Sequence, residues 1–244
     1  MKALGIDIGG SALKGAPVDT RTGRLLAERL RLATPLPLKP AQMARSVAEI
    51  AAFFKWRGPI GVGFPGAIQG PRIMTAANMH PQFVGCDGGR LFSRATGCRV
   101  AIINDAAAAG LAEMRFGAGR GFMGKTLLLT LGTGVGTALA YQGVVVPLEL
   151  GHLPWKGRSA EKRVSSSARE DGKLSWAEWG GRLRDYIAVL EDLLWPELII
   201  VGGGVSAKHG KFFKFLKTRA RLVPAEFLNR AGIVGTALWG AEQA

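Results

Sequence analysis

A glycine-rich turn between two apolar segments occurs twice in this chain, and this repeat constrains the fold more than any other feature. Residues 4–16 read LGIDIGGSALKGA, and residues 129–139 read LTLGTGVGTAL. Both copies predict a strand, a glycine turn and a second strand. Glycine turns let backbone N–H groups close around an oxyanion, so two of them facing each other across a cleft could hold a phosphate chain from both sides. The repeat favours a phosphotransferase over a protein with two ordinary glycine hairpins.

The composition indicates a globular protein. The chain has 244 residues with 48% apolar content, enough for one core or two small lobes. No apolar run approaches the roughly 20 residues that span a bilayer, and Lys2 leads into a strand instead of a signal peptide. We expect a cytoplasmic protein without a membrane partner. Cys86 and Cys98 have no metal-binding spacing, so free thiols are expected.

The charge balance is strongly basic. The chain has 32 Lys and Arg against 18 Asp and Glu, a formal charge of +14. Such a field favours a polyanionic partner, although a solvated basic surface is an equal alternative. The basic residues of 156–173 and 208–221 lack the interleaved aromatic residues of a single-strand platform, so no specific nucleic acid is expected.

Apolar periodicity predicts alternating strands and helices in each half of the chain. In the first half, strands are expected at 3–8, 13–18, 25–32, 59–63 and 99–103, and helices at 41–56, 89–96 and 106–116. The second half repeats the theme, with a hairpin of strands 126–131 and 137–141, a helix at 175–194, a buried strand at 197–201, and helices from Val205 and Ala231.

Two nucleotide-binding patterns occur in the wrong context. Residues 119–126, GRGFMGKT, match the Walker A pattern but follow an expected helix and lead into a strand, the reverse of a P-loop. Residues 61–66, GVGFPG, match GxGxxG, but the following AIQGP cannot form the helix that would hold a dinucleotide pyrophosphate. Neither pattern supports a nucleotide site.

Two polar clusters are candidates for the chemistry. Asn104 and Asp105 end an apolar strand and begin an alanine-rich helix. Asp105 could cap that helix, but at the carboxyl end of a strand its carboxylate could also take the proton of a substrate hydroxyl that attacks phosphorus. Glu149 and His152 lie within one turn, a pairing suited to neighbouring sugar hydroxyls, although the imidazole taken alone is typical of a structural residue.

Over essentially its whole length the chain resembles the ROK (repressor, ORF, kinase) family of sugar kinases, and within it the polyphosphate-using glucokinase branch. The resemblance rests on six motifs taken in order. They are DIGGS at 7–11 with Lys14 and Gly15, GFPG at 63–66, NDA at 104–106, LGTGVG at 131–136, ELGH at 149–152 and VGGGVS at 201–206. Thr34, Pro35, Pro37 and Pro40 resemble the TPxPxxP signature of the polyphosphate-using branch.

One departure from the wider family concerns zinc. Many ROK kinases carry a CxCGxxGCxE zinc motif after the ExGH segment, whereas this chain has no cysteine beyond Cys98. The expectation is therefore no zinc site. The sugar-binding glutamate of that motif is missing with it, and nothing in the sequence identifies its replacement. Polyphosphate glucokinases also lack the motif, which agrees with the branch assignment.

The resemblance implies an α/β fold of the actin-like (ribonuclease H-like) type with two lobes. The small lobe is expected at 1–117, joined by the C-terminal helix 231–244, with the first phosphate hairpin and the catalytic Asp105. The large lobe is expected at 118–230, with the second phosphate turn and the nucleotide-side turn. Lobe closure on sugar binding and a homodimer are further expectations.

The resemblance also implies roles for individual residues. Glucose would be held by Gly66, Asn78, Asn104, Glu149 and His152, while Asp105 activates its 6-hydroxyl. The phosphate chain would contact Gly9, Gly10, Ser11, Ala12 and Lys14 on one side and Gly132, Thr133, Gly134 and Val135 on the other. Asp7 would hold Mg²⁺ through water, and Gly202, Gly203 and Gly204 would form the nucleotide-side turn.

The expected reaction is transfer of the terminal phosphoryl group of inorganic polyphosphate, and also of ATP, to the 6-hydroxyl of glucose or mannose. A basic protein suits polyphosphate because a long anion releases counterions as it binds. The alternatives are an ATP-dependent ROK kinase for another hexose or an N-acetylhexosamine, and a polyanion-binding protein without activity. A ROK repressor is disfavoured because Met1 runs directly into the first strand and leaves no room for a helix-turn-helix.

Overall fold

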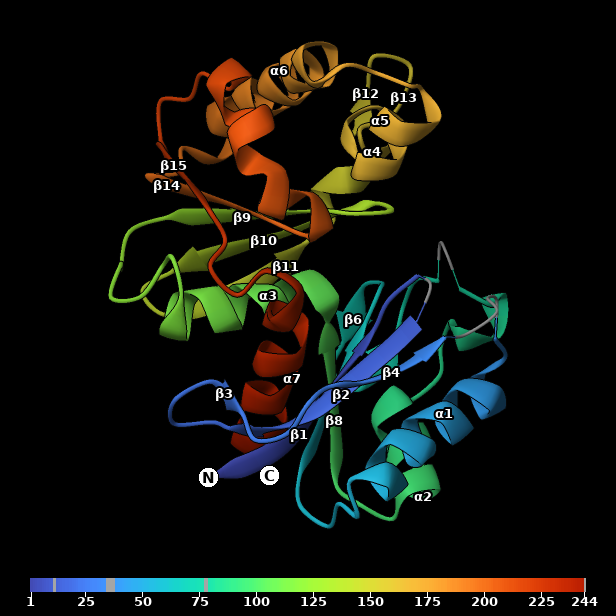
Figure 1. Cartoon of the computed structure of the whole chain (residues 1–244). Coiled ribbons are helices and arrows are strands. Elements are labelled where there is room, and N and C mark those ends of the chain that lie inside the picture. Colours follow the sequence, from blue (N-terminus) through green and yellow to red (C-terminus); the bar gives the residue numbers. More distant parts are fainter. Residues whose placement is uncertain (11, 34–37, 77–78, 244) are drawn as a thin grey trace. The chain divides into compact units, whose positions relative to one another are not determined.

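The chain forms two compact units, each built on its own β-sheet (Figure 1). The computed structural model describes residues 1–10, 12–33, 38–76 and 79–243. The first unit contains residues 1–112 and 230–244, and the second contains residues 113–229. The first boundary falls inside helix α3 (Asp105–Phe116), whereas the sequence-based division placed it after residue 117.

The sheet of the first unit has the strand order β3-β2-β1-β5-β8, and β4 also pairs with β2. The hairpin of β1 and β2 is antiparallel, while β5 and β8 continue the sheet in parallel from β1. The strand bounds are Lys2–Ile8 (β1), Ala12–Asp19 (β2), Arg24–Leu25 (β3), Leu30–Ala33 (β4), Ile60–Phe64 (β5) and Val100–Asn104 (β8).

The two faces of this sheet are covered differently, because side chains of a strand alternate between faces. Leu4, Ile6 and Ile8 of β1 are fully buried in a core with residues of α1 (Pro40–Phe53) and α2 (Gly88–Thr96). On the opposite face lies α7 (Ala231–Glu242) (Figure 1). A Cβ at Gly61 would fall on the carbonyl oxygen of Thr236, so the glycines of this face let the helix backbone approach the strands.

The second unit repeats this topology. Its sheet has the order β11-β10-β9-β14-β15, with an antiparallel β9–β10 hairpin followed by β14 and β15 in parallel. The repeat of strand, glycine turn and strand predicted from the sequence is thereby confirmed. The bounds are Thr126–Leu131 (β9), Val135–Tyr141 (β10), Val144–Leu148 (β11), Leu198–Gly202 (β14) and Arg221–Pro224 (β15).

Helix α6 (Trp176–Leu194) covers one face of this second sheet and has clear boundary signals. Ser175 accepts a hydrogen bond from the backbone N–H of Glu178, whose carboxylate accepts one from the N–H of Ser175, a capping box. The helix ends at Trp195, which has a left-handed conformation and precedes a proline. Trp179, Leu183 and Tyr186 of α6 pack in the core with Leu129 of β9.

Two sequence predictions were wrong in detail. The strand expected at 25–32 is interrupted, because only Arg24–Leu25 and Leu30–Ala33 pair with β2 and the residues between them do not. The helix expected from Val205 is a 3₁₀ helix, η3 (Gly204–Lys211), with a non-helical backbone at Lys208. Glycine at 204 and 210 lowers the propensity for a regular α-helix there.

The sequence analysis did not predict several short elements that depend on tertiary contacts. Two of these are the strands β11 and β15. The others are β6 (Ile68–Gln69), β7 (Arg72–Ile73), β12 (Pro154–Trp155), β13 (Arg158–Ser159), α4 (Glu161–Val164), α5 (Ser166–Asp171) and the 3₁₀ turns Pro81–Phe83, Leu150–His152, Phe213–Phe215 and Leu228–Arg230.

The contexts of the two misleading nucleotide patterns agree with the sequence analysis. Residues 119–126 lie between the end of α3 at Phe116 and the start of β9 at Thr126. Residues 61–66 end β5 and lead into the β6–β7 hairpin, with no helix between. Among the described residues, no helix has the length and apolar character needed to cross a membrane.

Candidate active site

The first phosphate turn closes at the end of the β1–β2 hairpin. The N–H of Gly9 donates to the carbonyl oxygen of Ala12 at 3.0 Å. Lys14 on β2 pairs in register with Asp7 on β1, so a positive charge lies opposite the carboxylate. Burial raises the pKa of Asp7 above its usual value, and the charge of Lys14 partly offsets that rise. Ser11, predicted to contact phosphate, lies outside the described residues.

Asp7 and Asp105 lie on either side of Gly63 at the carboxyl ends of β1, β5 and β8. A Cβ at Gly63 would stand 3.7 Å from Oδ1 of Asp7 and 3.8 Å from Cα of Asp105. Parallel strands end at the same edge of a sheet, which is why these residues meet although they are far apart in sequence. The fold therefore brings together the two predicted acidic residues of the first unit.

The first turn of α7 presses against Asp7. A Cβ at Gly232 would stand 2.7 Å from Cγ of Asp7 and 2.9 and 3.0 Å from its two carboxylate oxygens. Any larger side chain at this position would displace the carboxylate. Gly232 was not among the predicted site residues, because its role depends on the packing of α7 against β1 and no local pattern marks it.

Asn104 provides the helix cap that the sequence analysis had considered for Asp105. Its Oδ1 accepts a hydrogen bond from the backbone N–H of Ala107 at 3.0 Å, and its Nδ2 donates to the carbonyl oxygen of Gly66 at 3.1 Å. The side chain of Asp105 accepts from the N–H of Ala106 at 2.8 Å. The Asn104 side chain is buried, and its two hydrogen bonds connect the start of α3 to the GFPG turn.

The GFPG turn is held from its other side by Thr75. The Oγ1 of Thr75 accepts a hydrogen bond from the N–H of Ala67 at 2.8 Å, and a Cβ at Gly66 would stand 2.5 Å from the carbonyl oxygen of Thr75. Gly66 therefore has a fixed backbone position. Asn78, also predicted to bind sugar, lies outside the described residues.

In the second unit, the second phosphate turn and the nucleotide-side turn lie against each other. The N–H of Gly132 donates to the carbonyl oxygen of Gly134 at 3.1 Å, and the N–H of Ser167 donates to the carbonyl oxygen of Gly132 at 3.2 Å. Gly203 has φ of +83°, and a Cβ there would stand 2.6 Å from the N of Leu131. Only glycine suits both requirements. Gly132, Thr133, Gly134, Val135, Gly202, Gly203 and Gly204 are thus brought to one edge of the second sheet.

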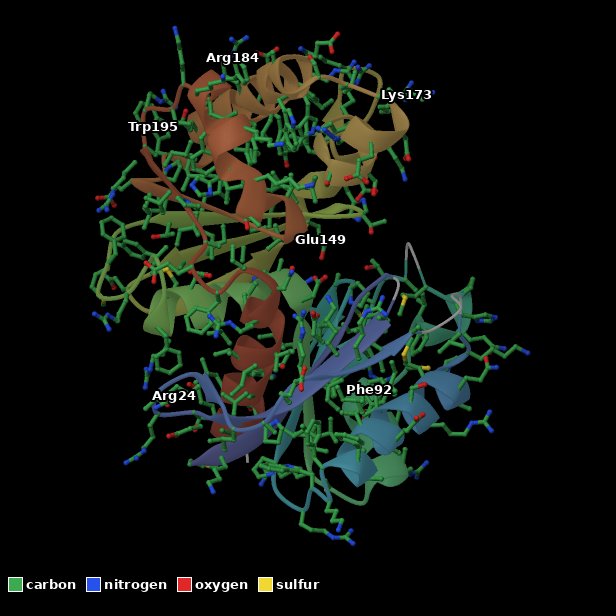
Figure 2. The ribbon with its side chains drawn as sticks, viewed as in Figure 1. Arg24, Phe92, Glu149, Lys173, Arg184 and Trp195 are labelled. Atoms are coloured by element: carbon green, nitrogen blue, oxygen red, sulfur yellow. The ribbon has the colours of Figure 1, made fainter. Side chains whose placement is uncertain are left out.

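Glu149 and His152 lie in the second unit, and Glu161 is a third charged residue near them. Nε2 of His152 stands 3.7 Å from Oε2 of Glu149. Burial raises the pKa of Glu149, the positive form of His152 lowers it, and the negative charge of Glu161 raises it further. Figure 2 labels Glu149 among the side chains of this unit. Glu161 is therefore close enough to Glu149 for its charge to act on that carboxyl.

Glu161 is a second residue of the candidate site that sequence reasoning missed. It begins the short helix α4, and its Oε2 lies 2.7 Å from the position of a Cβ on Gly134, in the second phosphate turn. Its side chain is only 11% exposed although Lys162 beside it is open to solvent. Nothing in the sequence distinguished this glutamate from other acidic residues, because its proximity to Glu149 depends on how α4 folds back.

A metal ion at this site would have few protein ligands. Among the described residues, no group of three or more His, Cys, Asp or Glu side chains could hold a metal ion. Mg²⁺ in phosphoryl-transfer sites needs only one or two carboxylates, since it keeps several waters and binds substrate phosphate. Asp7 supplies one such carboxylate. Burial makes its ionised form costly, and a bound cation would offset that cost.

The duplicated sheets, each with a glycine turn at the end of its first hairpin, define a protein of the actin-like sugar kinase fold. A model of the ROK family matches residues 3–162, and the chain belongs to this family.

Known relatives resemble the chain over nearly its whole length. It is 42% identical over 237 residues to the polyphosphate glucokinase of Mycobacterium tuberculosis strain H37Rv, covering 96% of this chain and 89% of the relative. The crystal structure of inorganic polyphosphate/ATP-glucomannokinase from Arthrobacter sp. strain KM matches with a TM-score of 0.96 and 44% identity, covering 100% and 99% of the two chains. A ROK family glucokinase from Streptomyces griseus, in complex with glucose and AMPPNP, shares the fold with a TM-score of 0.82 at 22% identity, covering 99% and 100%.

Proposed function

We propose that this chain is a polyphosphate glucokinase. It transfers the terminal phosphoryl group of inorganic polyphosphate to the 6-hydroxyl of glucose, and it also uses ATP as donor and mannose as acceptor. The observation that carries the proposal is the 42% identity to polyphosphate glucokinases over 96% of the chain. Identity of this extent spans both structural units and therefore includes both phosphate turns.

The chemical step assigns Asp105 as general base. Its carboxylate takes the proton of the glucose 6-hydroxyl as that oxygen attacks the terminal phosphorus. The new bond joins the sugar oxygen to phosphorus, and the bond to the bridging oxygen of the donor breaks. The shortened polyphosphate, or ADP, carries away the electron pair. Asn104 positions Asp105 by capping α3 and holding Gly66.

Charge on the transferred group is stabilised by backbone amides and by Lys14. The turns at residues 9–12 and 132–135 supply N–H donors, with the hydroxyl of Thr133 as a further donor. Asp7 would hold Mg²⁺ through water, and the ion would supply positive charge that neutralises the phosphate oxygens. Such an ion would also offset the cost of keeping Asp7 ionised in its buried position.

The residues proposed to recognise sugar are those that the family resemblance implies. Gly66, Asn78 and Asn104 belong to the first unit, whereas Glu149 and His152 belong to the second. Glu161 joins Glu149 and His152 and takes the place of the glutamate lost with the zinc motif, because it lies beside Gly134 and is electrostatically coupled to Glu149. The protein needs no zinc for this recognition.

The donor preference follows from the charge and from the proline-rich signature. A net charge of +14 favours a polyanion, and Gly202, Gly203 and Gly204 provide the turn against which ATP binds. The basic residues between Lys156 and Lys217 form a track for polyphosphate. We also propose a cytoplasmic homodimer.

The decisive experiment measures glucose 6-phosphate formation by the purified protein with Mg²⁺ and either long-chain polyphosphate, ATP or no donor. Product from nucleotide-free polyphosphate is the expected result. Product from ATP alone would keep the kinase but reject the donor. The absence of product with both donors would reject glucose phosphorylation and direct the assay to N-acetylhexosamines.

A further inference from the structure

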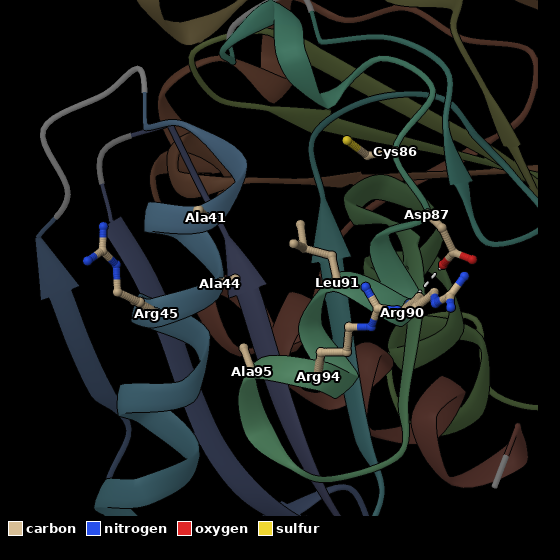
Figure 3. A pocket seen from close by; sticks show the side chains of 9 residues that line it. All are labelled: Ala41, Ala44, Arg45, Cys86, Asp87, Arg90, Leu91, Arg94 and Ala95. Atoms are coloured by element: carbon tan, nitrogen blue, oxygen red, sulfur yellow. Dashed lines mark hydrogen bonds between the residues drawn. The ribbon is translucent and has the colours of Figure 1, made fainter.

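A hollow of about 500 Å³ lies in the first unit between α1 and α2, and the proposed reaction does not use it. Figure 3 shows Ala41 and Ala44 on α1 and Leu91 and Ala95 on α2 between the two helices. Cys86 and Asp87 complete the lining where the chain enters α2. The floor is apolar, so it offers no hydroxyl or amide side chain that could recognise a sugar or a base.

The polar part of the lining consists mainly of arginines. Arg45 extends from α1, and Arg90 and Arg94 extend from α2 on the other side (Figure 3). Arg90 and Arg94 are four residues apart, so they share one face of the helix. Within the described part of the chain, none of the three guanidinium groups forms an ion pair. All three are exposed.

The one carboxylate of the lining is already engaged. Asp87 accepts a hydrogen bond from the backbone N–H of Arg90 at 2.8 Å as the N-cap of α2. The lining therefore has three positive charges against one negative charge, and its guanidinium groups are available to an anion from solution. Because arginines supply the net charge around this hollow, a ligand of repeating negative charge is complementary to it.

Chain connectivity limits how far this hollow lies from the first phosphate turn. Ala33 at the end of β4 pairs with Ala12, which closes that turn. Ala41 at the edge of the hollow is eight residues further along, and eight residues span at most about 29 Å. A single long anion can therefore contact both places.

We propose that the arginine-lined hollow between α1 and α2 is a distal binding site for the polyphosphate chain, which retains long donors while their terminal phosphate is at the phosphate turn. This inference rests on the proposed function, because it assumes polyphosphate as the donor. It assigns Arg45, Arg90 and Arg94 to substrate retention and gives them no part in phosphoryl transfer.

The test compares the double variant Arg90→Ala/Arg94→Ala with the double variant Arg24→Ala/Arg57→Ala. The control removes the same charge from exposed positions of the first unit outside the hollow. We expect the first pair to raise the KM for long-chain polyphosphate by roughly five- to tenfold, as the loss of two charge-assisted contacts implies. The KM values for tripolyphosphate and ATP, and kcat with all donors, should not change.

Arg45→Ala, on the other helix, provides an independent variant and should raise the same KM. Equal increases for tripolyphosphate and long chains, or equal effects of the test and control pairs, would overturn the distal site. Direct binding of fluorescently labelled long-chain polyphosphate to the intact variants separates this inference from the donor assignment. If the wild-type protein uses only ATP but the Arg90/Arg94 pair still weakens this binding selectively, the donor assignment fails and the binding site stands.

Discussion

Asp105 and Asn104 are adjacent in sequence but have separate tasks. Since Asn104 provides the cap of α3, Asp105 can be changed without removing that cap. We expect Asp105→Asn to lower kcat by about 10²- to 10⁴-fold, because a general base contributes that much, while the KM for glucose changes little. Steady-state kinetics with both donors measures this. Near-normal turnover with an unchanged melting temperature would return Asp105 to a structural role.

Gly232 positions Asp7 from outside the motif that contains Asp7. In Gly232→Ala, the added Cβ would stand 2.7 Å from Cγ of Asp7 and would push the carboxylate aside. We expect a lower kcat and a higher Mg²⁺ concentration for half-maximal activity. Gly181→Ala is the matched control, because a Cβ at that helical glycine meets no atom within 4 Å. Equal Mg²⁺ requirements in the two variants would contradict the positioning role.

The ionisation of Glu149 gives a pH-dependent test of Glu161. The pKa of Glu149 is raised by burial and by the charge of Glu161, and activity requires its ionised form if it accepts sugar hydroxyl groups. Glu161→Gln removes one of the two raising effects, so the pKa falls. The acid limb of kcat/KM for glucose against pH should therefore move to lower pH, with a higher KM for glucose. An acid limb that stays in place would show that Glu161 does not act on Glu149.

At the scale of elements, helix α7 and strand β5 approach closely because β5 has glycine where the helix backbone passes. Gly61→Ala would place a Cβ on the carbonyl oxygen of Thr236. Overpacking of this kind costs about 1–3 kcal/mol, so the urea midpoint should fall by a corresponding amount. Gly210→Ala, with open space around its Cβ, serves as the control. An unchanged midpoint for Gly61→Ala would mean that α7 can shift without cost.

Elements defined by local signals were predicted well, and elements defined by distant partners were not. The hairpin strands, α2 and α6 have apolar periodicity together with a cap or a turn residue, such as Ser175 before α6 and Gly97 after α2. Strand β15 becomes a strand because it pairs with β14, and β11 because it pairs with β10. Their sequences alone contain no comparable signal.

For the whole molecule, the charge of +14 has a measurable consequence. Binding of a long polyanion releases counterions, so log Kd should rise linearly with log salt concentration, and more steeply for long-chain polyphosphate than for ATP. Measurement of the KM for each donor at salt concentrations from about 50 to about 200 mM checks this. Parallel slopes for the two donors would limit binding to the few charges around the phosphate turns.

The resemblance to the ROK family added Asp7 as a candidate residue. The sequence by itself determined the α/β class, the duplicated hairpins and the candidate residues Asp105, Glu149 and His152. These features depend on local patterns, namely strand alternation, glycine turns and polar residues at strand ends. The tertiary structure decided that Asn104 caps α3, that Gly232 lies on Asp7, that Glu161 is coupled to Glu149, and that three arginines surround one hollow. Each of these is a contact between residues whose distance in space is set by packing, and no local pattern encodes it.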